Sequence, residues 1–172
     1  MASLKKDIEL LVNVLQLMPH PEGGYYNEVY RATDKIGVAR EKYGDAYRAS
    51  ATSIYFLLKG DDFSAWHKIK SDEIWNYHEG NSINILSINP QGVLKQHKLG
   101  SKLSDPDAEY QVVIPAGDWF CAYVEDGEGY TLVGCTVAPG FEFVDFEIAD
   151  RNKLTQEFKQ HQALIHKFTR GS

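Results

Sequence analysis

Residues 63–80, FSAWHKIKSDEIWNYHEG, place one histidine and one glutamate six positions apart, between two tryptophans. His67 and Glu73 are the residue types that metal ions and acid–base reactions use. If both side chains lie in an apolar interior, burial raises the pKa of Glu73, whereas pairing of the two groups favours imidazolium and carboxylate. The segment therefore predicts either a metal site or a metal-free acid–base pair.

The spacing of this segment matches a known pattern. Residues 67–80 keep the spacing H-x-H-x3-E-x6-G, and residues 115–120 keep the start of P-x-G-x2-H. These are the two motifs of the cupins, which are small jelly-roll barrels, and the chain resembles them. The stretches PHPEGGYY (19–26) and VGCTVAPGFEF (133–143) are similar to the Cupin-5 family, single-domain cupins of largely unassigned activity. The resemblance extends from about residue 17 to residue 170 and implies a homodimer.

The metal ligands that the resemblance implies are incomplete. A metal-binding cupin is expected to supply three histidines and one glutamate from the two motifs. Ile69 and Phe120 occupy the second and third histidine positions, and neither side chain can donate to a metal. His67 and Glu73 alone fall short of the ligand sets of structural and catalytic zinc. We therefore expect no bound metal and no cofactor, with a metal-dependent enzyme of atypical ligand set as an alternative.

Other polar residues are weaker candidates for this site. His78 follows Glu73 by five positions, so strand alternation turns it to the opposite face unless a bulge intervenes. His97 lies in a polar run and is expected to face solvent. His20 and Glu22 lie in a glycine-containing turn before the barrel, where a role at the barrel rim is a hypothesis. We exclude a phosphate loop there, because no Lys-Ser/Thr follows and Glu22 would repel phosphate.

Without a metal, His67 is expected to act as a base and Glu73 as the orienting group or acid. The resemblance extends to metal-free epimerase cupins, which act on nucleotide-linked sugars with a histidine base and a tyrosine acid. This chain has no basic cluster to hold a diphosphate. Arg31 and Arg48 are isolated basic residues, and one of them is a candidate for binding a substrate carboxylate.

Aromatic side chains are expected to line a pocket at the barrel mouth around His67 and Glu73. The tryptophans can also serve simply as core. The complete set of candidate pocket residues is Tyr55, Trp66, Trp75, Tyr77, Phe120, Trp119, His20, Glu22 and Arg48.

Helices are predicted only at the two ends of the chain. Apolar residues recur every three or four positions over residues 3–17, which predicts an N-terminal helix. Residues 150–165 predict a C-terminal helical tail, with Asp150 near its cap. Between them, short apolar or alternating runs bounded by Gly, Pro, Asn or Asp predict antiparallel strands. The predicted fold is all-β: a single-domain cupin, an antiparallel jelly-roll β-barrel with its core at about 25–148.

Two turns are predicted to close hairpins, at Asn89–Gly92 and Asp126–Gly129. Cys121 and Cys135 flank the second turn, so we predict that they are near neighbours across two strands. Buried, reduced thiols are the expected state, with a redox pair as the alternative.

Composition restricts the class of protein. The 172 residues are 43% hydrophobic and 12% aromatic, enough for one domain with an apolar core. The net charge of −6 and the lack of a basic cluster argue against a nucleic-acid partner. No run approaches the roughly 20 apolar residues of a membrane span, and the charged N-terminus does not resemble a secretory signal. Two cysteines fit a reducing compartment, so a cytoplasmic protein is expected.

The functional prediction is a small-molecule-binding cupin. We expect a metal-independent acid–base enzyme, of the isomerase or epimerase type, acting on a small polar or sugar-like ligand. A non-catalytic small-molecule binding protein is the main alternative.

Overall fold

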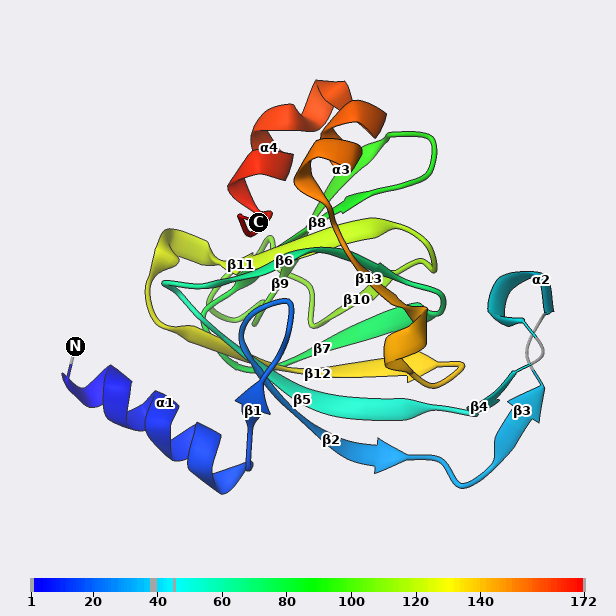
Figure 1. Cartoon of the computed structure of the whole chain (residues 1–172). Coiled ribbons are helices and arrows are strands. Elements are labelled where there is room, and N and C mark those ends of the chain that lie inside the picture. Colours follow the sequence, from blue (N-terminus) through cyan, green and yellow to red (C-terminus); the bar gives the residue numbers. More distant parts are fainter. Residues whose placement is uncertain (1, 38–39, 45, 172) are drawn as a thin grey trace.

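The computed structural model describes residues 2–37, 40–44 and 46–171, and antiparallel strands dominate them (Figure 1). Two sheets face each other and their inner side chains form a common core. The sheets do not close into a continuous barrel at their edges. The all-β architecture of paired antiparallel strands that the sequence predicts is confirmed.

The larger sheet carries most of the site. Its strand order is β1 (Met18–Pro19), β2 (Tyr25–Arg31), β5 (Thr52–Lys59), β12 (Tyr130–Ala138), β7 (Asp72–Gly80) and β10 (Gln111–Ile114). The smaller sheet has the order β13 (Phe146–Ile148), β6 (Phe63–Ile69), β11 (Trp119–Val124), β8 (Ile83–Ile88) and β9 (Leu94–Leu99). A separate ribbon pairs β3 (Lys35–Gly37) with β4 (Tyr47–Ala49).

Strand alternation divides the apolar residues into three layers. Phe56, Trp75 and Phe120 point between the sheets and form the central core. Trp66 belongs to a second cluster on the outer face of the smaller sheet. Leu57 belongs to a third cluster, on the outer face of the larger sheet. Helices cover part of both outer faces, so β6, β8, β11 and β12 are buried over most of their length.

The helices lie at the ends of the chain, as predicted, with different bounds. The N-terminal helix α1 (Ala2–Val14) ends earlier than residue 17, and Gln16 has a φ of 53°. The tail consists of α3 (Arg151–Glu157), the 3-10 turn η3 (Lys159–His161) and α4 (Gln162–Lys167). Asp150 caps α3 by accepting a hydrogen bond from the backbone N–H of Lys153. Short turns are α2 (Arg40–Tyr43), η1 (Glu125–Gly127) and η2 (Phe143–Asp145).

Each terminal helix segment covers one outer face. In Figure 1, α3 and α4 lie over β8 and β11, whereas α1 lies beside the larger sheet near β1. None of the helices in the described part of the chain is long and apolar enough to cross a membrane.

One predicted hairpin is confirmed and the other is wrong. Asn89–Gly92 joins the paired strands β8 and β9, and Gly92 has a φ of 78°. The segment after Cys121 instead crosses from the smaller sheet to the larger one, because β11 pairs with β8 and β12 pairs with β5 and β7. Cys121 lies opposite Leu86 in the smaller sheet, and Cys135 lies in the larger sheet. The prediction that the two cysteines are neighbours across two paired strands is therefore wrong. Both thiols are free and buried.

Candidate active site

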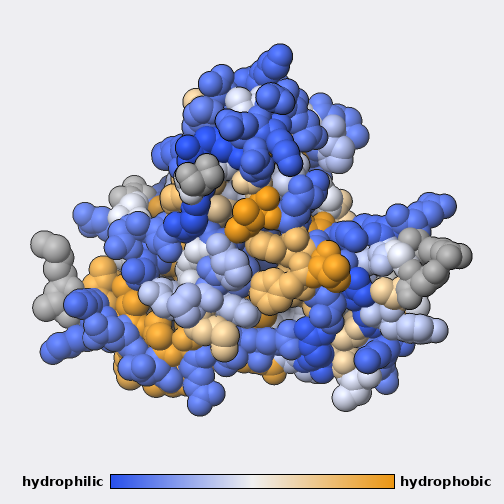
Figure 2. Space-filling view, in the orientation of Figure 1, coloured by the Kyte–Doolittle hydropathy of each residue, from blue (hydrophilic) through white to orange (hydrophobic). Residues whose placement is uncertain are grey.

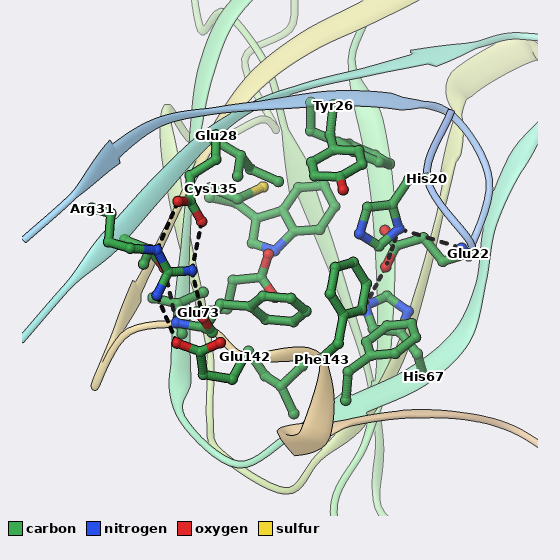
Figure 3. Close-up of a pocket in the computed structure, with 18 residues that line it drawn as sticks. His20, Glu22, Tyr26, Glu28, Arg31, His67, Glu73, Cys135, Glu142 and Phe143 are labelled. Carbon is green, nitrogen blue, oxygen red and sulfur yellow. Dashed lines mark hydrogen bonds and ion pairs between the residues drawn. The ribbon is translucent and has the colours of Figure 1, made fainter. Parts of the chain in front are cut away.

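A cavity of about 280 Å³ is lined by inner side chains of both sheets and by the segments before β2 and β13 (Figure 3). Its walls combine carboxyl groups and histidines with aromatic rings. Ligand pockets commonly have volumes of about 300–1,000 Å³. This cavity therefore suits a small ligand.

One wall is a cluster of three buried polar side chains (Figure 3). The carboxyl oxygen Oε2 of Glu22 lies 3.2 Å from Nε2 of His67 and 3.4 Å from Nδ1 of His20. The other carboxyl oxygen, Oε1, accepts a hydrogen bond of 2.9 Å from the Ser64 hydroxyl. The side chains of Glu22 and His67 are 8% and 3% exposed, so water screens their contact weakly.

The contacts of His67 define its tautomer. Its Nδ1 lies 2.7 Å from the carbonyl oxygen of Ala65, and because a carbonyl only accepts, Nδ1 carries the hydrogen. Nε2 then presents a lone pair to Glu22. Burial lowers the pKa of His67 to about 4, and burial raises the pKa of Glu22. Oε2 of Glu22 therefore lies 3.2 Å from this lone pair, within reach for proton transfer.

The loop before β2 brings Glu22 to His67. Gly23 and Gly24 have φ values of 118° and 69°, which favour glycine, and they turn the chain back over β6. The backbone N–H of Ala65 donates to the carbonyl oxygen of Glu22 at 2.8 Å. The guanidinium of Arg170 also donates to this carbonyl, so the C-terminal end of the chain holds the loop in place.

Glu73 lies apart from this cluster, on β7 of the larger sheet, and its residue is 8% exposed. Burial, followed by the charge of Glu22, raises the pKa of Glu73 to about 8, and a hydrogen bond with Cys135 opposes the shift. Glu73 is therefore mainly a neutral carboxylic acid at pH 7. The sequence suggested a pair of His67 with Glu73, but the contact that His67 makes is with Glu22, whereas Glu73 projects into the same cavity from the opposite sheet.

Across the cavity, Arg31 is held by two carboxylates (Figure 3). Its Nε and Nη2 each donate to Glu28 at 2.8 Å, and its Nη1 donates to Glu142 at 2.7 Å. These contacts occupy the guanidinium N–H groups of Arg31 that would otherwise bind a substrate carboxylate. Arg48 does not reach the cavity, because its guanidinium donates to Asp145 at 2.6 and 2.9 Å.

Aromatic residues of the segment before and within β13 cover the cavity. Phe141 and Phe146 line it, and Phe143 stacks against His20 with ring centroids 6.1 Å apart. Phe143 is also 51% exposed, and its neighbour Val144 is exposed as well. Figure 2 shows apolar side chains gathered in the middle of this face, between the C-terminal helices and the larger sheet.

The structure divides the predicted pocket residues into two groups. Those that line the cavity are His20, Glu22, His67, Glu73 and Trp75. Those that do not line it are Tyr55, Trp66, Tyr77, Trp119, Phe120 and Arg48.

Strand alternation explains most of the second group. Trp66 precedes His67 and Trp119 precedes Phe120, so both indoles point outward to the C-terminal helices. Tyr55 likewise points outward, toward α1. Phe120 does point inward, into the central core, but it does not line the cavity, and its ring centroid lies 4.0 Å from that of His67. Tyr77 packs at the edge of the central core and donates to the carbonyl of Gly80.

Several lining residues were not predicted, among them Tyr26, Glu28, Glu142 and Phe143. Alternation in the β2 run YYNEVYR puts Tyr26 and Glu28 on one face, which is the signal that was available. Glu142 and Phe143 lie at the 3-10 turn before β13, where no periodicity exists to reveal their direction.

The residues at the cupin metal positions do not fit a metal ion. Ile69 lines the cavity at one histidine position, and Phe120 packs against the ring of His67 at another. Within the described residues, no group of three or more His, Cys, Asp or Glu side chains is arranged to hold a metal ion. The Nε2 atom of His67, which would ligate a metal, contacts Glu22 instead.

Comparisons with known proteins agree with this architecture. A family model described as the cupin superfamily (DUF985), Cupin_5, matches residues 9–149. An X-ray structure of a Shewanella oneidensis protein is 34% identical, with a TM-score of 0.82, over 95% of this chain and 98% of that chain. A hypothetical protein from Leishmania major is 33% identical, with a TM-score of 0.85 and the same coverage.

Similar proteins are also found at lower sequence identity. An uncharacterised protein of Saccharomyces cerevisiae is 28% identical over 148 residues, 80% of this chain and 73% of that protein. The oxalate decarboxylase of Bacillus subtilis, 13% identical with a TM-score of 0.54, covers 90% of this chain and 40% of its own. At that identity the likeness shows the fold alone. The predicted jelly-roll cupin is confirmed.

Proposed function

This chain belongs to the Cupin_5 family of the cupin superfamily, and we propose that it is a metal-independent acid–base enzyme of the isomerase or epimerase type. Membership of the superfamily supports a small-molecule-binding protein, and the proposal adds a reaction to that role. The observation that carries it is the presence of two separate proton-transfer groups in one small cavity. These groups are the Glu22–His67 pair and Glu73.

The first group is the proposed base. Because the pKa of Glu22 is raised, its ionised form binds a proton more strongly than an ordinary carboxylate does. Oε2 accepts the proton from a carbon of the ligand and shares it with the lone pair on Nε2 of His67. Ser64 holds the second carboxyl oxygen, so the acceptor keeps a fixed direction.

The second group, Glu73, is the proposed acid. With a pKa of about 8 it carries its proton at pH 7 and can donate it to a ligand oxygen that gains negative charge. Burial raises the pKa of both carboxyl groups, and the proposal assigns the accepting role to the ionised Glu22 beside His67 and the donating role to the protonated Glu73. The result is the transfer of a proton from carbon to a base while an adjacent oxygen is neutralised, which is the first half of an isomerisation or epimerisation.

The test is hydrogen exchange at carbon. The protein is incubated in D2O with a panel of small neutral hydroxy-ketones and hydroxy-aldehydes, and loss of C–H signal is followed by proton NMR. We expect exchange that His67→Gln reduces by about 100-fold or more, the usual contribution of one acid–base group. His97→Gln is the matched control, because His97 lies on β9 outside the cavity lining.

Two outcomes would contradict the proposal. If ligands bind and no exchange occurs, the chain is a non-catalytic binding protein. If exchange stops after dialysis against EDTA and returns with one divalent metal, the chemistry depends on a metal with ligands outside the two motifs. Metal content of untreated protein, measured by mass spectrometry, accompanies the assay.

The proposal also includes the oligomeric state and the cellular location of the protein. We propose a homodimer, because the outer edge of β2 beyond Tyr26 has no strand partner in the described part of the chain and exposes Val29 and Tyr30. Light scattering that gives a mass near 19.5 kDa would contradict the dimer. We also propose a cytoplasmic location, which the two free thiols support. Fractionation of the native cells checks this directly.

A further inference from the structure

Trp75 is a buried hydrogen-bond donor without an acceptor. It is 1% exposed, it lines the cavity, and no acceptor among the described residues bonds to its Nε1. Trp66, by contrast, donates its Nε1–H to the carbonyl oxygen of Leu164 at 3.1 Å. Buried indole N–H groups usually have a partner, so an unpaired one at a cavity wall calls for a specific reason.

Glu73 stands beside Trp75 on the same wall. The two residues are two positions apart on β7, so both side chains project from the same face of the strand. Both line the cavity, and Glu73 points into it (Figure 3). Because the Glu73 carboxyl is held mainly in its protonated form, it too can donate a hydrogen bond. Two side chains at this wall of the cavity, both from β7, therefore carry hydrogen-bond donors.

We propose that Trp75 Nε1–H and the Glu73 carboxyl together bind the carbonyl oxygen of a neutral ligand, and that Trp75 determines specificity for that oxygen. An indole N–H donates and cannot accept, so its partner must be an acceptor. A carbonyl oxygen has two lone pairs and no hydrogen of its own, so it can accept from both donors at once without placing a third, unpaired donor beside them, as a hydroxyl would. This inference rests on the proposed function, since the oxygen held is next to the carbon that loses its proton.

The charges around the cavity favour a neutral ligand over an anion. Glu28 and Glu142 both line the cavity, and Arg31 supplies one positive charge against these two. The guanidinium is already occupied by the two carboxylates and by the carbonyl of Phe141. A carboxylate ligand would meet a net negative charge with no free cation from Arg31, whereas a ketone or aldehyde would not.

The test uses three probes with the same number of carbon atoms. Dihydroxyacetone carries a carbonyl, glycerol lacks it, and glycerate is an anion. The indole N–H signals of the three tryptophans are followed in 15N-labelled protein by NMR, and Trp75→Phe identifies the Trp75 signal. We expect dihydroxyacetone to shift this signal and to bind more tightly than glycerol, and glycerate to bind least.

Trp75→Phe keeps an aromatic ring and removes the N–H. We expect it to weaken dihydroxyacetone binding about tenfold, the size of one good hydrogen bond, and to leave the weak glycerol affinity unchanged. Trp119→Phe is the matched control, because Trp119 faces the C-terminal helices, and its substitution should leave both affinities as they are. Circular dichroism and thermal unfolding of each variant verify the fold.

The inference is overturned if dihydroxyacetone leaves the Trp75 signal in place up to its solubility limit. It is also overturned if glycerol or glycerate binds as tightly, or if Trp75→Phe binds dihydroxyacetone with unchanged affinity. These readouts measure binding and not turnover. Binding through Trp75 without hydrogen exchange would remove the proposed enzymatic function and keep the carbonyl site. Hydrogen exchange together with an unchanged affinity of Trp75→Phe for dihydroxyacetone would remove the carbonyl site and keep the enzymatic function.

Discussion

The carboxyl oxygen Oε2 of Glu22 lies 3.2 Å from Nε2 of His67, although Glu22 belongs to the loop between β1 and β2 of one sheet and His67 to β6 of the other. His67 is the histidine that the first cupin motif retains. Its neighbours at the former metal positions are Ile69 and Phe120, so its polar partner comes from outside both motifs. The contact makes a position that is typical of a metal ligand one half of a buried acid–base pair.

Glu22→Gln should slow proton transfer while leaving the stability of the folded protein nearly unchanged. The amide can still donate to Nε2 of His67 and accept from Ser64, so we expect a melting temperature close to that of the unsubstituted protein. The amide cannot take up a proton, so the rate of C–H exchange should fall about 100-fold or more. Glu147→Gln on β13 is the control, because Glu147 is exposed and pairs with Lys68 at the surface. Undiminished exchange in Glu22→Gln would remove Glu22 from the mechanism.

Glu73→Gln should change how stability depends on pH. The pKa of Glu73 is raised from 4.5 to about 8 on folding, so the folded state binds the proton more tightly than the unfolded state does. Its contribution to stability is therefore complete below pH 4.5 and is lost as the pH rises through 8. For this buried group the loss is on the order of a few kcal/mol.

Urea unfolding at a series of pH values measures this effect. The free energy of unfolding of the unsubstituted protein should fall from pH 5 to pH 9 by more than that of Glu73→Gln. Glu109→Gln, at an exposed position that pairs with Lys102, should keep the pH dependence of the unsubstituted protein. Parallel curves for all three proteins would mean that Glu73 ionises normally.

Arg48→Met should destabilise the segment that covers the cavity. Arg48 and Asp145 form a buried ion pair with side chains that are 7% and 4% exposed, and Asp145 belongs to η2. Removing the arginine leaves the Asp145 carboxylate, among the described residues, with a single cation, Lys70 at 3.5 Å, so we expect a loss of about 3 kcal/mol in the free energy of unfolding.

The comparison that isolates the charge is the double variant Arg48→Met with Asp145→Asn. It should recover part of the lost stability, because no unpaired carboxylate remains. Lys68→Met breaks an exposed pair with Glu147 and should cost less than about 1 kcal/mol. If Arg48→Met costs no more than Lys68→Met, the buried pair does not hold η2 in place.

Gly80→Ala and Gly117→Ala distinguish two reasons why the cupin motifs contain glycine at these positions. One is a positive φ angle, and the other is a lack of space for a Cβ atom. Both residues have positive φ, 97° and 84° respectively. A Cβ at Gly80 would collide with the backbone carbonyl oxygen of Tyr130, whereas a Cβ at Gly117 meets nothing within 4 Å. We expect Gly117→Ala to cost about 1 kcal/mol from backbone conformation alone, and Gly80→Ala to cost about 3 kcal/mol through added overpacking. Equal losses in urea unfolding would contradict the collision.

The sequence by itself was enough to predict the strands, and their alternation encodes the direction of the side chains, although the pocket predicted from sequence wrongly included the outward-pointing Trp66 and Trp119. A period of two is a local property of the backbone, so alternation around His67 and around Trp75 is readable from neighbouring residues. The hairpin at Asn89–Gly92 was readable for the same reason, because its turn residues act locally. The motif spacing likewise identified Ile69 and Phe120 as replacements for metal ligands.

Only the tertiary structure decided which strands meet and which side chains share the cavity. Cys121 and Cys135 fit a hairpin in sequence, yet their strands lie in different sheets. Glu22 reaches His67 because Gly23 and Gly24 fold the loop over β6. Pairings of this kind depend on the packing of the two sheets and on loops that close over long distances in the chain. No local period encodes them, and for that reason the partner of His67 emerged only from the folded molecule.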